Sequence, residues 1–250
     1  MVFTILPWLS SPSSAELSSV ATAEMETALQ RTMTNTTAPS ASVSPPPVAS
    51  PPWLVAASSM SVVVHDAPES ASPARLLDPA EEIGEQLVFL VKQDTSEWLE
   101  VYLPVRPNGS TGWIRREQVE LSEHRYRIEL TLSDKRLVVF EGDELVMEEP
   151  IGVGAEESPT PGGIYYLKEL LSPPDPDGFY GPYAYGLSGF SDTEIDYNGG
   201  EGVIGIHGTD DPSSVGRSVS HGCIRLSNEA IVRLVEEIGL PLGTPVMIQE

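Results

Sequence analysis

The chain has 250 residues, a hydrophobic fraction of 40% and a formal net charge of −23, from 14 basic and 37 acidic side chains. This acidity argues against binding along a nucleic-acid backbone or on an anionic lipid surface, because both need clustered cations. The single cysteine, Cys223, excludes an internal disulfide and a four-cysteine zinc site, and no stretch approaches the ~18 apolar residues of a membrane span.

Residues 1–60 are rich in Ser, Pro, Thr and Ala and show no sustained helical or strand period. A segment of this composition buries too little apolar surface to offset its ordering entropy, so we expect a disordered leader or stalk. Its first nine residues are apolar but follow no positive charge, so they match a signal peptide only in part. An export signal that lacks its true start and an intracellular disordered tail both stay open.

The next segment, residues 61–121, contains short β-rich runs separated by turns. Strands are predicted at 61–65, 86–91, 98–103 and 112–114, with a hairpin turn at 107–109. Several strands in so short a segment indicate a small β-barrel. The segment resembles the small bacterial Src-homology-type barrels found beside cell-wall enzymes, which implies an accessory domain.

Residues 122–250 predict a second, mainly β domain. Apolar and polar side chains alternate from Tyr126 to Leu132, which indicates a strand with one buried face. One helix is expected to begin at Ser227 or Asn228 and to end at Gly239, because apolar residues at helical spacing lie between a cap and a stop signal. Further strands are predicted at 136–140, 145–154, 163–171, 202–207 and 245–249, and a long irregular insertion at 172–200.

The residues that can carry chemistry concentrate at 206–228, which holds the only cysteine and two of the four histidines. The thiolate is the nucleophilic form of cysteine, and an adjacent imidazole can take its proton and leave an ion pair. We expect His207, at the end of a predicted strand, to be the base for Cys223, and the Gly208 carbonyl to orient its ring. The amides of Gly222 and Cys223 can form an oxyanion hole.

The residues alone leave several roles open. His221 either contacts the substrate or only fixes the shape of its loop. Arg225 pairs either with a substrate carboxylate or with one of the 37 acidic side chains. Tyr183 and its aromatic neighbours either wall a substrate groove or pack and anchor the loop. His207, His221 and Cys223 are ligand types of a catalytic zinc, but no HExxH helix accompanies them.

Four motifs occur in order: SPTPGG at 158–163, GPYAYGLSGFS at 181–191, HGT at 207–209 and SHGCIRLSN at 220–228. Together they resemble the L,D-transpeptidases, whose catalytic domain is of the YkuD type. The resemblance implies a β-sandwich catalytic domain of mixed sheets over 122–250, with one short helix after the nucleophile. It also implies a site without metal or cofactor, and export to the cell envelope or the extracellular space.

The activity implied by this resemblance is cross-linking of peptidoglycan stem peptides. Cys223 would attack a tetrapeptide stem after its diamino acid, release D-Ala, and pass the acyl group to an amine of a neighbouring stem, with His207 as base. Carbapenem-type β-lactams would inhibit through Cys223, and the protein would act as a monomer without nucleic acid. The substrate contacts implied in this way are Ser220, His221, Arg225, Asn228 and Tyr183.

Three alternatives to this activity stay open. An L,D-carboxypeptidase would use the same site with water as the acceptor. A non-catalytic wall-binding protein would keep the fold, but replacement of Cys223 or His207 would then be expected, and both residues are present. A metal-dependent hydrolase would lose its activity to a chelator, whereas a cysteine acyltransferase would be blocked by thiol alkylation.

Overall fold

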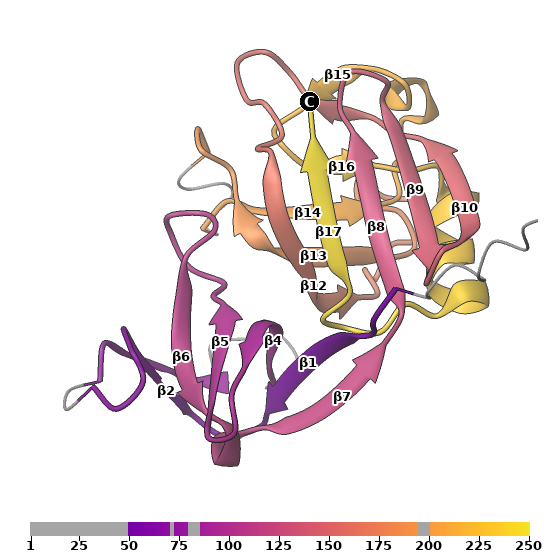
Figure 1. Cartoon of the computed structure of the whole chain (residues 1–250). Helices are drawn as coiled ribbons and strands as arrows, with labels where there is room; N and C mark the ends of the chain where they lie inside the picture. The colour runs from indigo at the N-terminus through magenta and orange to yellow at the C-terminus, as the bar shows by residue number, and fades with distance from the viewer. Residues whose placement is uncertain (1–49, 71–72, 80–85, 195–200) are drawn as a thin grey trace, which may run out of the picture. The chain divides into compact units, whose positions relative to one another are not determined.

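The computed structural model describes residues 50–70, 73–79, 86–194 and 201–250 (Figure 1). These residues are mainly β, as the sequence predicts. Most of the expected leader lies outside the described residues. Among the described helices, none has the length and apolar character needed to cross a membrane.

Seven strands form an N-terminal antiparallel sheet in the order β3-β2-β6-β5-β4-β1-β7. Its core residues are aliphatic or aromatic, with Phe89, Leu99 and Ile114 fully inaccessible, and Ser58 is the one buried polar residue of the sheet among those described. A short 3₁₀ turn, η2 (Arg116–Gln118), precedes the last strand. In chain order the strands are β1 (Trp53–Ser58), β2 (Val62–His65), β3 (Arg75–Leu77), β4 (Leu87–Asp94), β5 (Trp98–Tyr102), β6 (Thr111–Arg115) and β7 (Glu120–His124).

This sheet begins earlier than the sequence predicts. The expected leader reaches residue 60, but β1 already pairs with β4 on one side and with β7 on the other. Val55 and Ala56 are buried between those neighbours. The strand was missed because its apolar run is short and follows a Pro-rich stretch, so only pairing with distant strands reveals it.

Eight strands form a second, mixed sheet in the order β10-β9-β8-β17-β12-β13-β14-β16, and β11 and β15 pair separately. The last strand, β17, enters between β8 and β12 and runs parallel to β8 (Figure 1). In chain order the strands are β8 (Tyr126–Thr131), β9 (Arg136–Glu141), β10 (Glu144–Pro150), β11 (Val153–Gly154), β12 (Gly163–Leu171), β13 (Ala184–Phe190), β14 (Val203–His207), β15 (Ser218–Ser220), β16 (Ile224–Arg225) and β17 (Pro245–Gln249).

The central strand β13 lies inside the insertion expected to be irregular, so that prediction is wrong for residues 184–190. Its glycines and small residues disfavour a strand when taken alone. In the fold, a Cβ at Gly186 would collide with Glu169, and one at Gly189 would collide with the ring of Tyr165. Side chains of β12 thus fill the space that these glycines leave, and every residue of β13 is buried.

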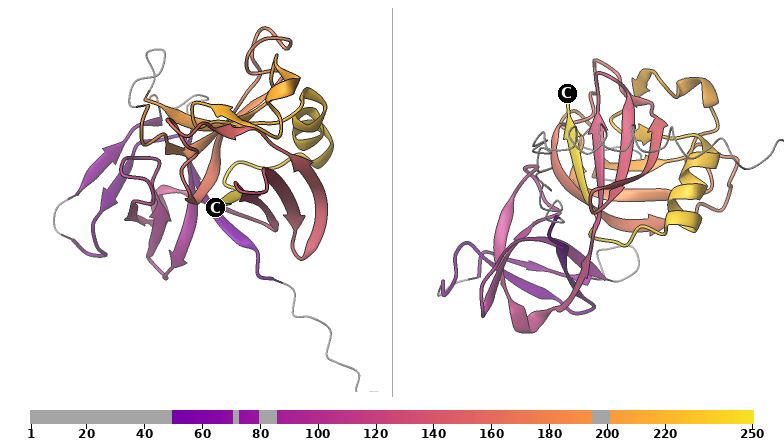
Figure 2. Two further views of the ribbon diagram at one scale, coloured as in Figure 1. Left: turned by 90° about the horizontal axis from the view of Figure 1, so that it is seen from above. Right: turned by 45° about the vertical axis from the view of Figure 1, so that its right-hand side comes forward.

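The predicted helix is present directly after β16. It comprises α2 (Asn228–Val232), which continues as a π-helical turn, η4 (Arg233–Ile238). Ser227 caps it by accepting a hydrogen bond from the amide of Ala230 at 3.1 Å, and Gly239 ends it in the left-handed region at φ 68°. Figure 2 (right) shows this yellow segment against the second sheet, where Ile231 and Leu234 join the core.

Candidate active site

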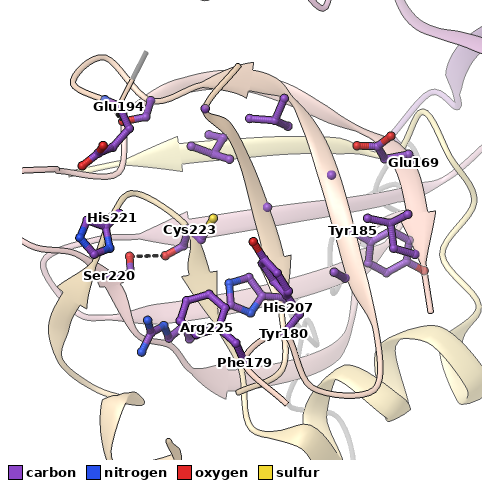
Figure 3. A pocket seen from close by; sticks show the side chains of 18 of the residues that line it. Glu169, Phe179, Tyr180, Tyr185, Glu194, His207, Ser220, His221, Cys223 and Arg225 are labelled. Atoms are coloured by element: carbon purple, nitrogen blue, oxygen red, sulfur yellow. Dashed lines mark hydrogen bonds between the residues drawn. The ribbon is translucent and has the colours of Figure 1, made fainter. Parts of the chain in front are cut away.

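A pocket of about 270 Å³ opens over the strands β12, β13 and β14 and the turn before β16. Figure 3 shows Cys223 near its middle, with His207 and Arg225 beside it. Glu194 lies toward one end and Glu169 toward the other. Segments far apart in the sequence thus meet around the only thiol of the chain.

His207 is the last residue of β14 and is only 1% exposed. Its Nδ1 lies 2.5 Å from the carbonyl oxygen of Gly208. Because a carbonyl only accepts, Nδ1 carries the proton, and in the neutral ring Nε2 keeps a lone pair. Nε2 is buried and has no hydrogen-bond partner among the described residues. The ring is therefore oriented as the sequence predicts, with its basic nitrogen available for a proton.

A small hydrogen-bonded turn presents Cys223. The hydroxyl of Ser220 donates to the carbonyl of Cys223 at 2.6 Å and accepts from the amide of Gly222 at 3.2 Å. Gly222 has φ +114°, a conformation that side chains disfavour. Ser220 thus fixes the turn, and the Gly222 amide expected in an oxyanion hole is engaged by this hydroxyl in the resting structure.

Thr160 supports the site although it does not line the pocket. It is 5% exposed, accepts from the amide of Gly154 at 2.9 Å, and donates to the carbonyl of Gly222 at 2.9 Å. It therefore ties β11 to the turn that carries the thiol. The SPTPGG motif around it was noted, but no local pattern indicates a contact with a residue 62 positions away.

Burial keeps both reacting groups neutral at rest. It raises the pKa of the Cys223 thiol, although a hydrogen bond with the Gly205 backbone and the charge of Arg225 oppose this. It also lowers the pKa of His207 to about 4, against the effect of the Gly208 carbonyl. Both shifts favour a neutral thiol and a neutral imidazole over an ion pair.

Arg225 lines the pocket and is 8% exposed. Its guanidinium carbon lies 5.0 Å from the ring centroid of Phe179, and its Nε is buried without a hydrogen-bond partner among the described residues. Phe179 and Tyr180 also pack against the ring of His207, with centroids 5.8 and 5.0 Å away. A buried cation without a bound carboxylate at its Nε is suited to an anionic group of a ligand.

Two of the expected substrate contacts lie elsewhere. The hydroxyl of Tyr183 donates to Glu236 on η4 at 2.7 Å, so this ring anchors its loop while Phe179 and Tyr180 line the pocket. The side-chain oxygen of Asn228 accepts from the amide of Thr209 at 2.8 Å. Asn228 therefore holds the loop that follows the candidate base, and neither residue reaches the pocket.

His221 lines the pocket, toward the end that holds Glu194 (Figure 3). Across the described ranges, no three His, Cys, Asp or Glu side chains gather in a way that could hold a metal ion. What the pocket combines is a thiol, an imidazole with a free basic nitrogen, and a buried cation. These are the groups required for nucleophilic acyl transfer from an amide or ester.

Comparison with known proteins places this site in a family. Residues 125–248 match the model of the L,D-transpeptidase catalytic domain, YkuD. The YkuD proteins of Bacillus licheniformis and Bacillus subtilis, named as candidate L,D-transpeptidases, are 37% and 32% identical to this chain over 123 residues. That region is 49% of this chain and 65% of each relative. The solved structure of Bdellovibrio bacteriovorus Bd1075 is 29% identical, with a TM-score of 0.41, over 51% of this chain and 48% of that one.

Proposed function

Since residues 125–248 are an L,D-transpeptidase catalytic domain, we propose that this chain cross-links peptidoglycan stem peptides by acyl transfer through Cys223. The observation that carries the proposal is the convergence of Cys223, His207 and Arg225 on one pocket. The half-buried thiol and the oriented imidazole match the two tasks of a nucleophile and its base.

The first half-reaction forms a thioester. The Cys223 sulfur attacks the carbonyl carbon of the donor diamino acid while His207 Nε2 accepts the thiol proton. The tetrahedral intermediate collapses, the carbon–nitrogen bond to the terminal D-Ala breaks, and the imidazolium returns its proton to the leaving amine. The Gly208 carbonyl, 2.5 Å from Nδ1, stabilises the imidazolium in between.

The second half-reaction releases the acyl group. A neutral amine of a neighbouring stem attacks the thioester carbon, His207 takes the amine proton, and the Cys223 sulfur leaves and is reprotonated. Arg225 would bind a carboxylate of the peptide, because its buried guanidinium lacks such a partner at Nε. Water in place of the amine would give an L,D-carboxypeptidase from the same site.

The proposal extends to location and inhibition. Peptidoglycan lies outside the cytoplasmic membrane, so we place the protein in the cell envelope or extracellular space, acting as a monomer. A carbapenem-type β-lactam presents a strained acyl carbon to the same sulfur and would acylate Cys223. The N-terminal sheet would then be an accessory module beside the catalytic domain.

Mass spectrometry of a muropeptide reaction tests the proposal. The full chain is incubated with a disaccharide tetrapeptide, alongside the Cys223→Ala variant and a wild-type sample with chelator. We expect a cross-linked dimer and free D-Ala in the wild-type samples with and without chelator, and neither product in the variant. Turnover by Cys223→Ala, or loss of turnover with chelator, would contradict cysteine acyl transfer. Tripeptide and D-Ala without dimer would assign the carboxypeptidase activity.

A further inference from the structure

One end of the pocket holds a buried carboxylate. Glu169 is 8% exposed on β12 and follows an irregularity in the strand register that separates it from Leu167, a fully buried core residue. An aliphatic side chain would be buried here at a lower cost in folding free energy, because a buried carboxylate requires ion pairs or hydrogen bonds to offset its lost hydration. Figure 3 shows its oxygens turned toward the middle of the pocket.

Glycines form the floor between this carboxylate and the thiol. Glu169 pairs with Gly186 across β12 and β13, and Gly186 pairs with Gly205 across β13 and β14. All three residues line the pocket, and the Cys223 thiol hydrogen-bonds the Gly205 backbone. No floor side chain therefore stands between the two functional groups along this line.

The spacing of the strands sets the length of this path. Glu169 and Gly205 lie two strand spacings apart, which is about 10 Å between backbones. One glutamate side chain and one extended amino-acid side chain together span that length. An acyl group on Cys223 can thus direct its own side chain along the glycine floor to the carboxylate.

Glu169 lies on the side of the thiol away from Arg225. Arg225 is the only permanent cation among the described lining residues, and Figure 3 places its guanidinium and the Glu169 carboxylate on opposite sides of Cys223, while Glu194 lies toward the end opposite Glu169. A carboxylate in a largely desolvated site favours an ammonium group. The far end of the glycine floor is therefore suited to a cationic side chain.

We propose that Glu169 is a specificity-determining residue that binds the side-chain ammonium of the donor diamino acid while Cys223 attacks its carbonyl carbon. This inference rests on the proposed function. The ammonium belongs to the donor, because an acceptor amine must be neutral to attack the thioester carbon, whereas a carboxylate partner favours the protonated amine. The ion pair also keeps the donor amine protonated, so that it does not compete as a nucleophile.

Two synthetic tetrapeptide donors test this role, one with a free side-chain amine and one with that amine acetylated. The acylation of Cys223 in the full chain is followed by intact mass spectrometry over a range of donor concentrations. We expect the wild type to be acylated at least tenfold more efficiently by the donor with the free amine. The difference should arise mainly because that donor reaches the half-maximal acylation rate at a lower concentration. Glu169→Gln should bring the preference close to one, and Glu169→Asp should retain part of it.

Glu194→Gln is the matched control, since it removes the other carboxylate of the pocket, and it should keep the wild-type preference. A wild type that acylates both donors equally, or a Glu169→Gln variant that keeps the preference, overturns the role of Glu169. No acylation of the wild type by either donor instead overturns the proposed function. If Glu169→Gln does not fold, the wild-type enzyme is assayed with donors whose side-chain amine is moved closer to the backbone, one methylene at a time. We expect the preference for the free amine over the acetylated amine to fall with each methylene removed. An unchanged preference would overturn the proposal.

Discussion

The N-terminal sheet and the second sheet both bury aliphatic side chains, but they differ sharply in the polar residues they bury. Of twelve buried polar or charged residues among those described, Ser58 alone belongs to the N-terminal sheet. The eleven others lie in the second domain, and five of them line the pocket: Glu169, Ser191, His207, Ser220 and Arg225.

This difference follows the position of the pocket. A buried polar group costs free energy unless it is hydrogen-bonded, so a domain under no functional constraint buries few. The N-terminal sheet has an apolar core around Leu99 and Ile114, and its His65, Trp98 and His124 each have one buried side-chain nitrogen without a partner among the described residues. In the second domain the corresponding nitrogens belong to His207 and Arg225, which line the pocket.

After loss of the nucleophile itself, the largest expected effect on turnover comes from substitution of the base. His207→Gln should lower the rate of Cys223 acylation by about 10²–10⁴-fold, because the glutamine cannot accept the thiol proton. In the wild type, the pKa of about 4 keeps His207 neutral through the neutral range, so the acid limb of the rate profile should lie near that value. An acid limb near pH 6.5 would show that the imidazole is not desolvated as described.

Removal of the two Thr160 hydrogen bonds should have an intermediate effect on the acylation rate. Thr160→Val keeps the shape of the side chain but leaves the Gly154 amide and the Gly222 carbonyl without their partner. We expect a loss of about 2–4 kcal/mol in unfolding free energy. We also expect a 10- to 100-fold lower acylation rate per folded molecule, because the turn that carries the thiol shifts. Thr160→Ser should restore most of both, and equal defects in the two variants would contradict the hydrogen-bonding role.

The buried imidazole should also make stability depend on pH. The unfolded chain protonates His207 near pH 6.5, whereas the folded chain does so only near pH 4. Stability is thus fully present above pH 6.5 and falls as the pH is lowered from 6.5 to 4, by about 3 kcal/mol in all. Urea unfolding of the wild type and His207→Gln at several pH values measures this, with the variant flatter. Parallel curves would contradict the burial of a neutral ring.

The smallest expected effect on turnover comes from a substitution in the core of the N-terminal sheet. Leu99 is fully buried in the N-terminal sheet, and Leu99→Ala should cost about 2–5 kcal/mol of stability through the cavity it leaves. The acylation rate per folded molecule should be unchanged. Denaturant unfolding and active-site titration with a thiol reagent provide the two measurements. A large fall in the acylation rate per folded molecule would contradict the expectation that the N-terminal core affects only stability.

The local patterns of the sequence predicted the elements whose signals are local. The alternation from Tyr126, the helix after Ser227 and the turn at Gly239 all depend on neighbouring residues, and the structure has them at these positions. The motif around Cys223 likewise predicted the nucleophile, the base and the orienting carbonyl of Gly208 as a group, and the structure brings these residues together. Their catalytic roles stay predictions until the acylation experiment is done.

Only the tertiary structure decided the features that depend on distant partners. Strand β13 exists because side chains of β12 fill the space over its glycines, and Thr160 reaches the thiol turn across 62 positions. Tyr183 contacts Glu236 on η4 and Asn228 contacts the loop at Thr209, which no local pattern indicates. The shifted pKa values of His207 and Cys223 also depend on the fold, because desolvation depends on everything packed around a group and not on its neighbours in the chain.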